Sequence, residues 1–118
     1  MHEVGIMESA LAAVRDEAAK HGATRVSRIV LRIGMLTGVD HEALRFAYEA
    51  LTPATLADGA VLEIESVPAR AHCAACAREF SVTQGFILQC PQCGEFCGDI
   101  RQGRELAIAR LEFPESTS

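Results

Sequence analysis

Four of the five cysteines stand in two Cys-x-x-Cys pairs, Cys73 with Cys76 and Cys90 with Cys93. Each pair places two thiolates on one tight turn, and residues 77–89 between them are long enough for the second turn to face the first. Four thiolates that converge in this way form a tetrahedral site, which suits zinc. The alternative is two disulfides or four unrelated buried thiols, but paired spacing in a chain that opens without an export signal favours a metal. The sequence therefore predicts a compact zinc ribbon with a short hairpin between its two turns.

The opening residues Met1, His2 and Glu3 form a second candidate metal site. A terminal amine, the amide nitrogen of His2 and its imidazole can enclose one metal ion in fused chelate rings. A further backbone nitrogen would favour the square-planar geometry of Ni(II) or Cu(II). This pattern alone is not specific, because a histidine in second position has no metal-binding role in most chains.

The composition of the chain excludes several classes of protein. Its 118 residues and 49% hydrophobic content fit one domain, or a modest domain that carries a small metal-stapled satellite. A net charge of −5 and a single lysine, Lys20, argue against a nucleic-acid-binding protein, which needs a basic stripe to contact phosphates. The charges also balance within 69–102. No apolar run is long enough to span a membrane, so we expect a cytoplasmic protein with no membrane partner.

No catalytic constellation is apparent in the sequence. It has no G-x-S-x-G motif, P-loop or dinucleotide-binding fingerprint. The four histidines lack the spacing of a catalytic metal site; they are His2, His21, His41 and His72. We therefore expect that the protein is not an enzyme.

Two amphipathic helices are expected to position the N-terminal residues. Apolar residues recur every three or four positions over 4–18, which predicts a helix that starts almost at the first residue and stops at Gly22. Asp40 is placed to cap a second helix, whose apolar stripe runs over 44–51 before Pro53 ends it.

Three strands are expected, at 26–33, 61–67 and 104–113. The first alternates in hydropathy like a half-buried strand. The other two flank the cysteine-rich segment, whose ends should lie close together, so we expect them to be antiparallel neighbours with the first strand at either edge. The first two strands carry side chains of opposite charge, which are those of Arg28, Arg32, Glu63 and Glu65. These side chains either pair across the strands on one shared solvated face, or only make a face of the sheet soluble.

Taken together, these features make the chain resemble one protein family over nearly its whole length. The segments that carry the resemblance are M-H-E, M-E-S-A-L, I-V-L-R-I-G, and the pairs C-A-A-C and C-P-Q-C ahead of a final strand. The family is that of the hydrogenase nickel-incorporation protein HypA, also called HybF, a nickel metallochaperone.

The resemblance implies two metals and two partners. Nickel would bind through His2, the Met1 amine and the backbone nitrogens of His2 and Glu3. Structural zinc would bind to four thiolates, those of Cys73, Cys76, Cys90 and Cys93. The resemblance also implies that nickel is delivered to the large subunit of [NiFe]-hydrogenase together with a partner GTPase, and it leaves open whether the protein works as a monomer or a homodimer.

We therefore expect an α+β protein with a small mixed three-stranded sheet packed with two helices, and with an inserted zinc-ribbon domain. The predicted domains are a discontinuous nickel-binding domain, residues 1–68 and 103–118, and a zinc-ribbon domain at 69–102. The alternative function is a zinc-ribbon adaptor or nucleic-acid-binding protein without nickel, against which the acidic balance and the metal-capable N-terminus both count.

Two residues near the cysteine pairs need separate interpretation. Some family members carry histidines beside both pairs, but here only His72 flanks the first pair and none flanks the second, which puts an exchange of zinc ligands in doubt. We interpret His72 as a neighbour of the site. Cys97, four residues beyond Cys93, is interpreted as a spare thiol rather than a substitute ligand.

Overall fold

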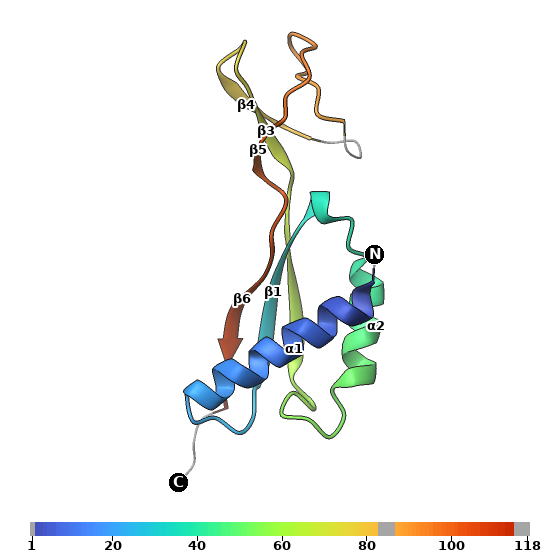
Figure 1. Ribbon diagram of the computed structural model, residues 1–118, viewed down its shortest axis with the longest axis vertical. Helices are drawn as coiled ribbons and strands as arrows, with labels where there is room; N and C mark the ends of the chain where they lie inside the picture. The colour runs from blue at the N-terminus through green and yellow to red at the C-terminus, as the bar shows by residue number, and fades with distance from the viewer. Residues whose placement is uncertain (1, 83–86, 115–118) are drawn as a thin grey trace. The chain divides into compact units, whose positions relative to one another are not determined.

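The computed structural model describes residues 2–82 and 87–114 of the chain. In chain order its elements are α1 (Glu3–Lys20), β1 (Arg28–Gly34), a 3-10 turn η1 (Met35–Thr37), α2 (His41–Leu51), β2 (Val61–Val67), β3 (Arg70–Cys73), β4 (Arg78–Ser81), β5 (Asp99–Gln102) and β6 (Leu106–Glu112) (Figure 1). The strands form two three-stranded sheets. This arrangement confirms the predicted α+β class.

The chain divides into two compact units. The first comprises Met1–Leu31, Val39–Glu65 and Ala107–Ser118, and the second comprises Arg32–Gly38 and Ser66–Leu106. The domain boundaries expected from the sequence, with 69–102 alone in the ribbon, stay a prediction.

Helix α1 follows the predicted apolar stripe and packs against α2. Its buried side chains lie on one face and are those of Met7, Val14 and Ala18. The helix ends at Lys20, and Gly22 then adopts a φ of 65°, a left-handed conformation that glycine reaches without strain. The predicted stop is therefore confirmed. Neither described helix is both long enough and apolar enough to cross a membrane.

Helix α2 begins at the predicted cap. The Asp40 carboxylate accepts hydrogen bonds from the backbone N–H groups of Glu42 and Ala43, at 2.9 and 3.1 Å. These bonds satisfy two of the donors that the first turn of a helix leaves without partners. The buried face of the helix matches the predicted stripe and comprises Leu44, Ala47 and Tyr48.

The first sheet has the strand order β2-β1-β6. The predicted adjacency of the strands at 61–67 and 104–113 is wrong, because β1 lies between them. The prediction that β1 is half-buried is also wrong, since the consecutive residues Ile29, Val30 and Leu31 are all buried. A run of buried residues is typical of a strand that is shielded on both faces.

The directions of the strands explain this order. Val61 donates its N–H to the carbonyl of Ser27, so β1 and β2 start at the same end, and α2 is the crossover that parallel neighbours require. By contrast, Ser27 donates to Glu112 and Gly34 donates to Glu105, so β6 runs antiparallel to β1. The sheet is therefore mixed, as predicted.

Arg28 on β1 forms ion pairs with both neighbouring strands. Its guanidinium lies 3.1 Å from the carboxylate of Glu63 on β2 and 3.5 Å from that of Glu112 on β6. The first pair confirms that Arg28 and Glu63 share one solvated face. Partly exposed pairs of this kind contribute about 1 kcal/mol or less to stability, so they help align the strands more than they hold the fold.

The second sheet has the order β4-β3-β5 and carries the cysteine-rich segment. Its strands are antiparallel, with Cys73 opposite Arg78 and His72 opposite Asp99. The buried cluster of this unit comprises Ala69, Ala71, Cys73, Phe80, Val82, Cys90 and Cys97. Part of the hairpin predicted between the cysteine pairs, residues 83–86, lies outside the described residues.

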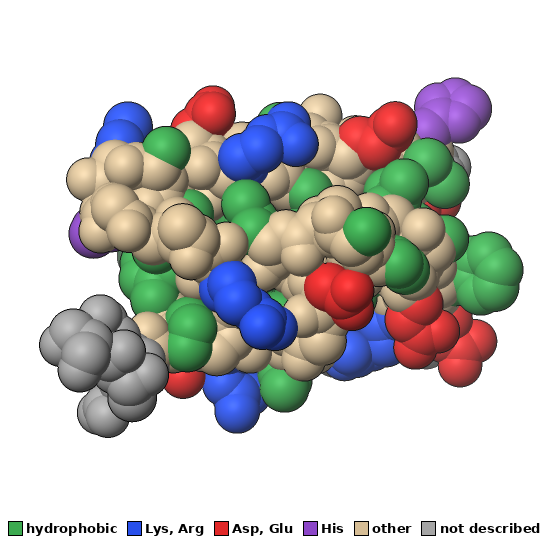
Figure 2. All heavy atoms as spheres, turned by 90° about the horizontal axis from the view of Figure 1, so that it is seen from below, with side chains coloured by type: hydrophobic (Ala, Val, Ile, Leu, Met, Phe, Trp, Pro, Cys, Tyr) green, Lys and Arg blue, Asp and Glu red, His purple; other side chains and the backbone are tan. Residues whose placement is uncertain are grey.

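The charged side chains give no broad field of one sign on the face drawn in Figure 2. Lys and Arg side chains alternate there with Asp and Glu side chains. This face therefore lacks the basic stripe that binding to a phosphate backbone requires.

Three backbone segments approach one another closely at Gly34, Ala69 and Gly103. Leu36 donates its N–H to the Gly103 carbonyl at 2.7 Å, and Gly34 donates to the Glu105 carbonyl at 2.8 Å. A β-carbon on Gly34 would overlap the carbonyl carbon and oxygen of Gly103, and one on Gly103 would lie 2.8 Å from the Ala69 α-carbon. Both positions therefore require glycine.

We predict that Gly34→Ala lowers the free energy of unfolding by about 3 kcal/mol, because the added methyl group must displace backbone atoms that cannot rotate away. Gly98→Ala is the matched control, since a β-carbon there meets no atom within 4 Å. Urea denaturation of both variants checks this prediction. Equal stability of the two variants would contradict the close approach.

Candidate functional site

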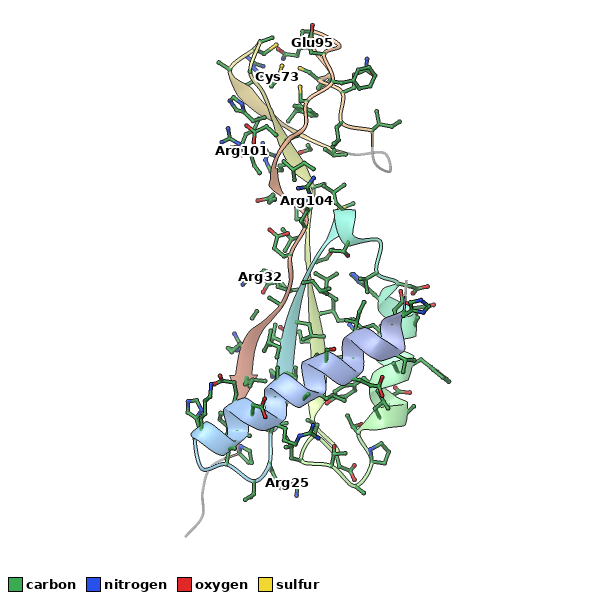
Figure 3. The ribbon with its side chains drawn as sticks, in the orientation of Figure 1. Arg25, Arg32, Cys73, Glu95, Arg101 and Arg104 are labelled. Carbon is green, nitrogen blue, oxygen red and sulfur yellow. The ribbon has the colours of Figure 1, made fainter. Side chains whose placement is uncertain are left out.

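The four predicted cysteines come together in the second unit. The sulfur atoms of Cys73, Cys76, Cys90 and Cys93 all lie within 4.8 Å of one another (Figure 3). The Cys73 and Cys93 sulfurs are 3.6 Å apart, and those of Cys76 and Cys90 are 3.9 Å apart. A tetrahedron with zinc–sulfur bonds of about 2.3 Å has edges of about 3.8 Å. The donor set therefore fits a zinc ion in both chemistry and size.

Each cysteine pair is held on a turn with the same backbone design. Cys73 ends β3 and Cys76 lies in the turn before β4, while Cys90 and Cys93 lie in a second turn. The residue that follows each pair has a left-handed φ, 54° at Ala77 and 78° at Gly94. The two turns therefore have the same backbone conformation. The left-handed position is an alanine in the first turn and a glycine in the second.

Backbone N–H groups stabilise a thiolate at the first cysteine of each pair. A hydrogen bond from the Cys76 N–H lowers the pKa of the Cys73 thiol to about 7. The N–H groups of Cys93 and Gln92 lower the pKa of Cys90 in the same way. By contrast, a hydrogen bond with Cys93, followed by burial, raises the pKa of Cys76 to about 12. A divalent cation would replace the remaining protons of the thiols. Metal affinity should therefore decrease as the pH is lowered.

His72 and Cys97 stand outside this group of four sulfurs. The His72 Nδ1 atom lies 3.7 Å from the carboxylate of Asp99, which fits its interpretation as a neighbour of the site. Cys97 is buried, and its thiol donates to the Glu95 carbonyl at 3.4 Å. Burial raises the pKa of Cys97 to about 11, and an interaction with the Cys73 thiol adds to this effect.

The N-terminal candidate residues lie in the first unit, where Met1 is outside the described residues. His2 is the N-cap of α1, and its side chain is exposed and makes no capping hydrogen bond. Glu3 is the first residue of the helix. The first backbone N–H groups of a helix have no acceptor within it, so the amide nitrogens of His2 and Glu3 can bind a metal without breaking the helix.

The N-terminal end of α1 lies beside the start of α2 (Figure 1). The Glu3 carboxylate anchors it there. It accepts a hydrogen bond of 2.9 Å from the backbone N–H of Asp40, and this bond lowers the pKa of Glu3. The Asp40 cap could be predicted from the sequence, but this contact could not. Hydropathy periodicity cannot reveal a bond between side chain and backbone across 37 positions of the chain.

Three comparisons with known proteins bear on this arrangement. The family model described as "Hydrogenase/urease nickel incorporation, metallochaperone, hypA" matches residues 1–113. A protein named hydrogenase maturation factor HypA from Roseiflexus sp. (strain RS-1) is 38% identical, over 99% of this chain and 95% of its own length. Another of that name from Chloroflexus aurantiacus (strain ATCC 29366 / DSM 635 / J-10-fl) is 40% identical, over 97% of this chain and 100% of its own length.

A solved structure shares the fold. The solution structure of the nickel metallochaperone HypA from Helicobacter pylori has a TM-score of 0.69 and 26% sequence identity. The match covers 96% of this chain and 97% of that one. The similarity therefore extends over both units of the chain.

We predict that Cys73→Ala reduces bound zinc from about one ion per chain to near zero, because three thiolates leave the site open. The second unit should unfold as well, since its small buried cluster includes three cysteines. Metal analysis and amide hydrogen exchange check both effects. The first unit should keep its protection, and full zinc content in Cys73→Ala would contradict the four-thiolate site.

We predict that Glu3→Ala speeds hydrogen exchange at the Asp40 amide, whereas Glu3→Gln, which keeps an acceptor oxygen, changes it less. Glu8→Ala, at an exposed position of the same helix, is the matched control and should have no effect. Because folding lowers the pKa of Glu3, the stabilisation is present above the ordinary carboxyl pKa and is lost as pH falls through the lowered value. An unchanged Asp40 amide in Glu3→Ala would contradict the anchor.

Proposed function

The chain belongs to the HypA family of nickel-incorporation metallochaperones, and from this premise we propose that it binds Ni(II) at its N-terminus and helps insert it into the large subunit of [NiFe]-hydrogenase. The family description names both hydrogenase and urease. The relatives compared above are named hydrogenase maturation factors, which favours hydrogenase as the target. The family's role is that of a metallochaperone, so the protein is not an enzyme.

The proposed nickel ligands are the Met1 amine, the His2 imidazole and the backbone nitrogens of His2 and Glu3. One observation carries this proposal: within the matched residues, the His2 side chain is exposed at the helix start and makes no capping hydrogen bond. Nitrogen donors on consecutive residues suit the square-planar geometry that Ni(II) adopts. The bond between Glu3 and Asp40 would hold the first turn of α1 in place around the ion.

The proposed resident metal is zinc on Cys73, Cys76, Cys90 and Cys93. A site with four thiolates has no open coordination position, which is typical of structural zinc. Zinc bound there would offset two of the four negative charges of the thiolates and hold the two turns together. The four ligands come from this chain's second unit, so a zinc ion there would stabilise that unit.

The proposed partners are a GTPase of hydrogenase maturation and the hydrogenase large subunit. The sequence contains no nucleotide-binding motif, so any energy-dependent step requires a separate protein. The protein could reach these partners as a monomer or as a homodimer. The alternative, a zinc-ribbon adaptor or nucleic-acid-binding protein without nickel, is not favoured by the family match.

The test of nickel binding is calorimetric titration of wild type and His2→Ala. His2→Ala should bind nickel at least about 100-fold more weakly, because alanine has no nitrogen to replace the imidazole. His21→Ala is the matched control, since this exposed histidine lies at the other end of α1. Affinity should also fall as pH drops, because the imidazole, amine and amides must lose protons to bind.

Two further measurements make the outcome decisive. An extra residue ahead of Met1 should weaken nickel binding, and zinc content should be the same in every form. If His2→Ala binds nickel as tightly as wild type while keeping its zinc, the nickel site is not at the N-terminus.

A further inference from the structure

The fifth cysteine lies beside the four-sulfur site rather than away from it. Cys97 is only 8% exposed and belongs to the same buried cluster as Cys73 and Cys90. Its hydrogen bond to the Glu95 carbonyl is 3.4 Å long, and a thiol is only a weak donor. A thiol in this position is a potential ligand held next to a complete set of ligands.

The four sulfurs differ in their access to solvent. Cys73 and Cys90 are buried and Cys76 is partly buried, whereas Cys93 is exposed. Protons, oxidants and alkylating reagents therefore reach Cys93 more readily than the other three. If one zinc ligand is released or modified, the exposed one should be first.

Cys93 and Cys97 are carried by the same short loop. Two backbone bonds of 2.8 Å close this loop, from Cys97 to Leu88 and from Cys90 to Glu95. The Cys93 sulfur lies 3.6 Å from that of Cys73, and Cys73 and Cys97 belong to one buried cluster. Cys97 is therefore joined to Cys93 by a short loop and is buried in the cluster that contains two of the other three ligands.

We propose that Cys97 is a reserve zinc ligand that takes the place of Cys93 in the four-thiolate site. This inference rests on the proposed zinc site and replaces the sequence interpretation of Cys97 as a spare thiol. One zinc–sulfur bond breaks and one forms. The Cys97 thiol releases its proton to solvent as it binds, and the freed Cys93 thiolate takes one up, so the site keeps four thiolates and its charge.

The test uses the full chain loaded with Co(II), whose sulfur-to-metal charge-transfer intensity reports the number of thiolate ligands. Cys93→Ala should keep the intensity of wild type. Cys93→Ala combined with Cys97→Val should lose about a quarter of it, because only three of the four thiolates remain. It should also bind Co(II) at least about tenfold more weakly than Cys93→Ala.

Cys97→Val in an otherwise wild-type chain is the matched control for packing at this buried position. It should keep four-thiolate intensity and unchanged affinity, so the two substitutions should be strongly non-additive. The proposal would be overturned if the losses of Co(II) affinity in the two single variants add up to the loss in the double variant. It would also be overturned if Cys93→Ala already shows the charge-transfer intensity of three thiolates. Wild type without four-thiolate intensity would instead refute the zinc site itself.

A second measurement avoids any dependence on the folding of the double variant. Limiting iodoacetamide should modify Cys93 first in the zinc-loaded wild type, and the zinc should remain bound. The same modification in Cys97→Ala should release the zinc. Equal zinc release from the two proteins, with Cys93 modified in both, would overturn the proposal.

Discussion

The structure of the second unit depends on four sulfur atoms held within 4.8 Å of one another. Four thiolates at this spacing repel one another, and only a cation between them turns the repulsion into a stabilising interaction. The strands around them are four residues long, and three of the seven residues in the buried cluster are cysteines. A core of this size gives little hydrophobic stabilisation, so a metal bound by the four sulfurs would supply much of the folding free energy of this unit.

In the first unit, the contacts of α1 hold a short N-terminal segment in place. A chain end is usually poorly ordered because few contacts restrain it. Here the buried face of α1 packs against α2, and the Glu3 carboxylate binds the N–H of Asp40. These contacts fix the residues that follow His2, while the His2 side chain stays exposed. An exposed side chain on an anchored backbone is suited to the proposed role of His2, which is to bind a metal ion and release it again.

The features that could be predicted from the sequence are those coded by neighbouring residues. The cysteine pairs, the Asp40 cap and the Gly22 stop each depend on a few adjacent positions. The structure contains all three of these features. Strand order could not be predicted in this way, because it depends on pairing between distant segments. The strands at 61–67 and 104–113 flank the ribbon in sequence but are not neighbours in the sheet, whereas the buried run at Ile29–Leu31 marks the central strand.

The two proposed metals have different ligands in this chain. Nickel binds to nitrogen donors at the N-terminus, and zinc binds to thiolates in the ribbon. X-ray absorption spectroscopy of protein loaded with one equivalent of each metal tests this assignment most directly, because each absorption edge reports the ligands of one element. We expect a nickel shell of nitrogen donors that includes an imidazole and lacks sulfur, and a zinc shell of four sulfurs. Sulfur in the nickel shell, or nitrogen in the zinc shell, would contradict the account.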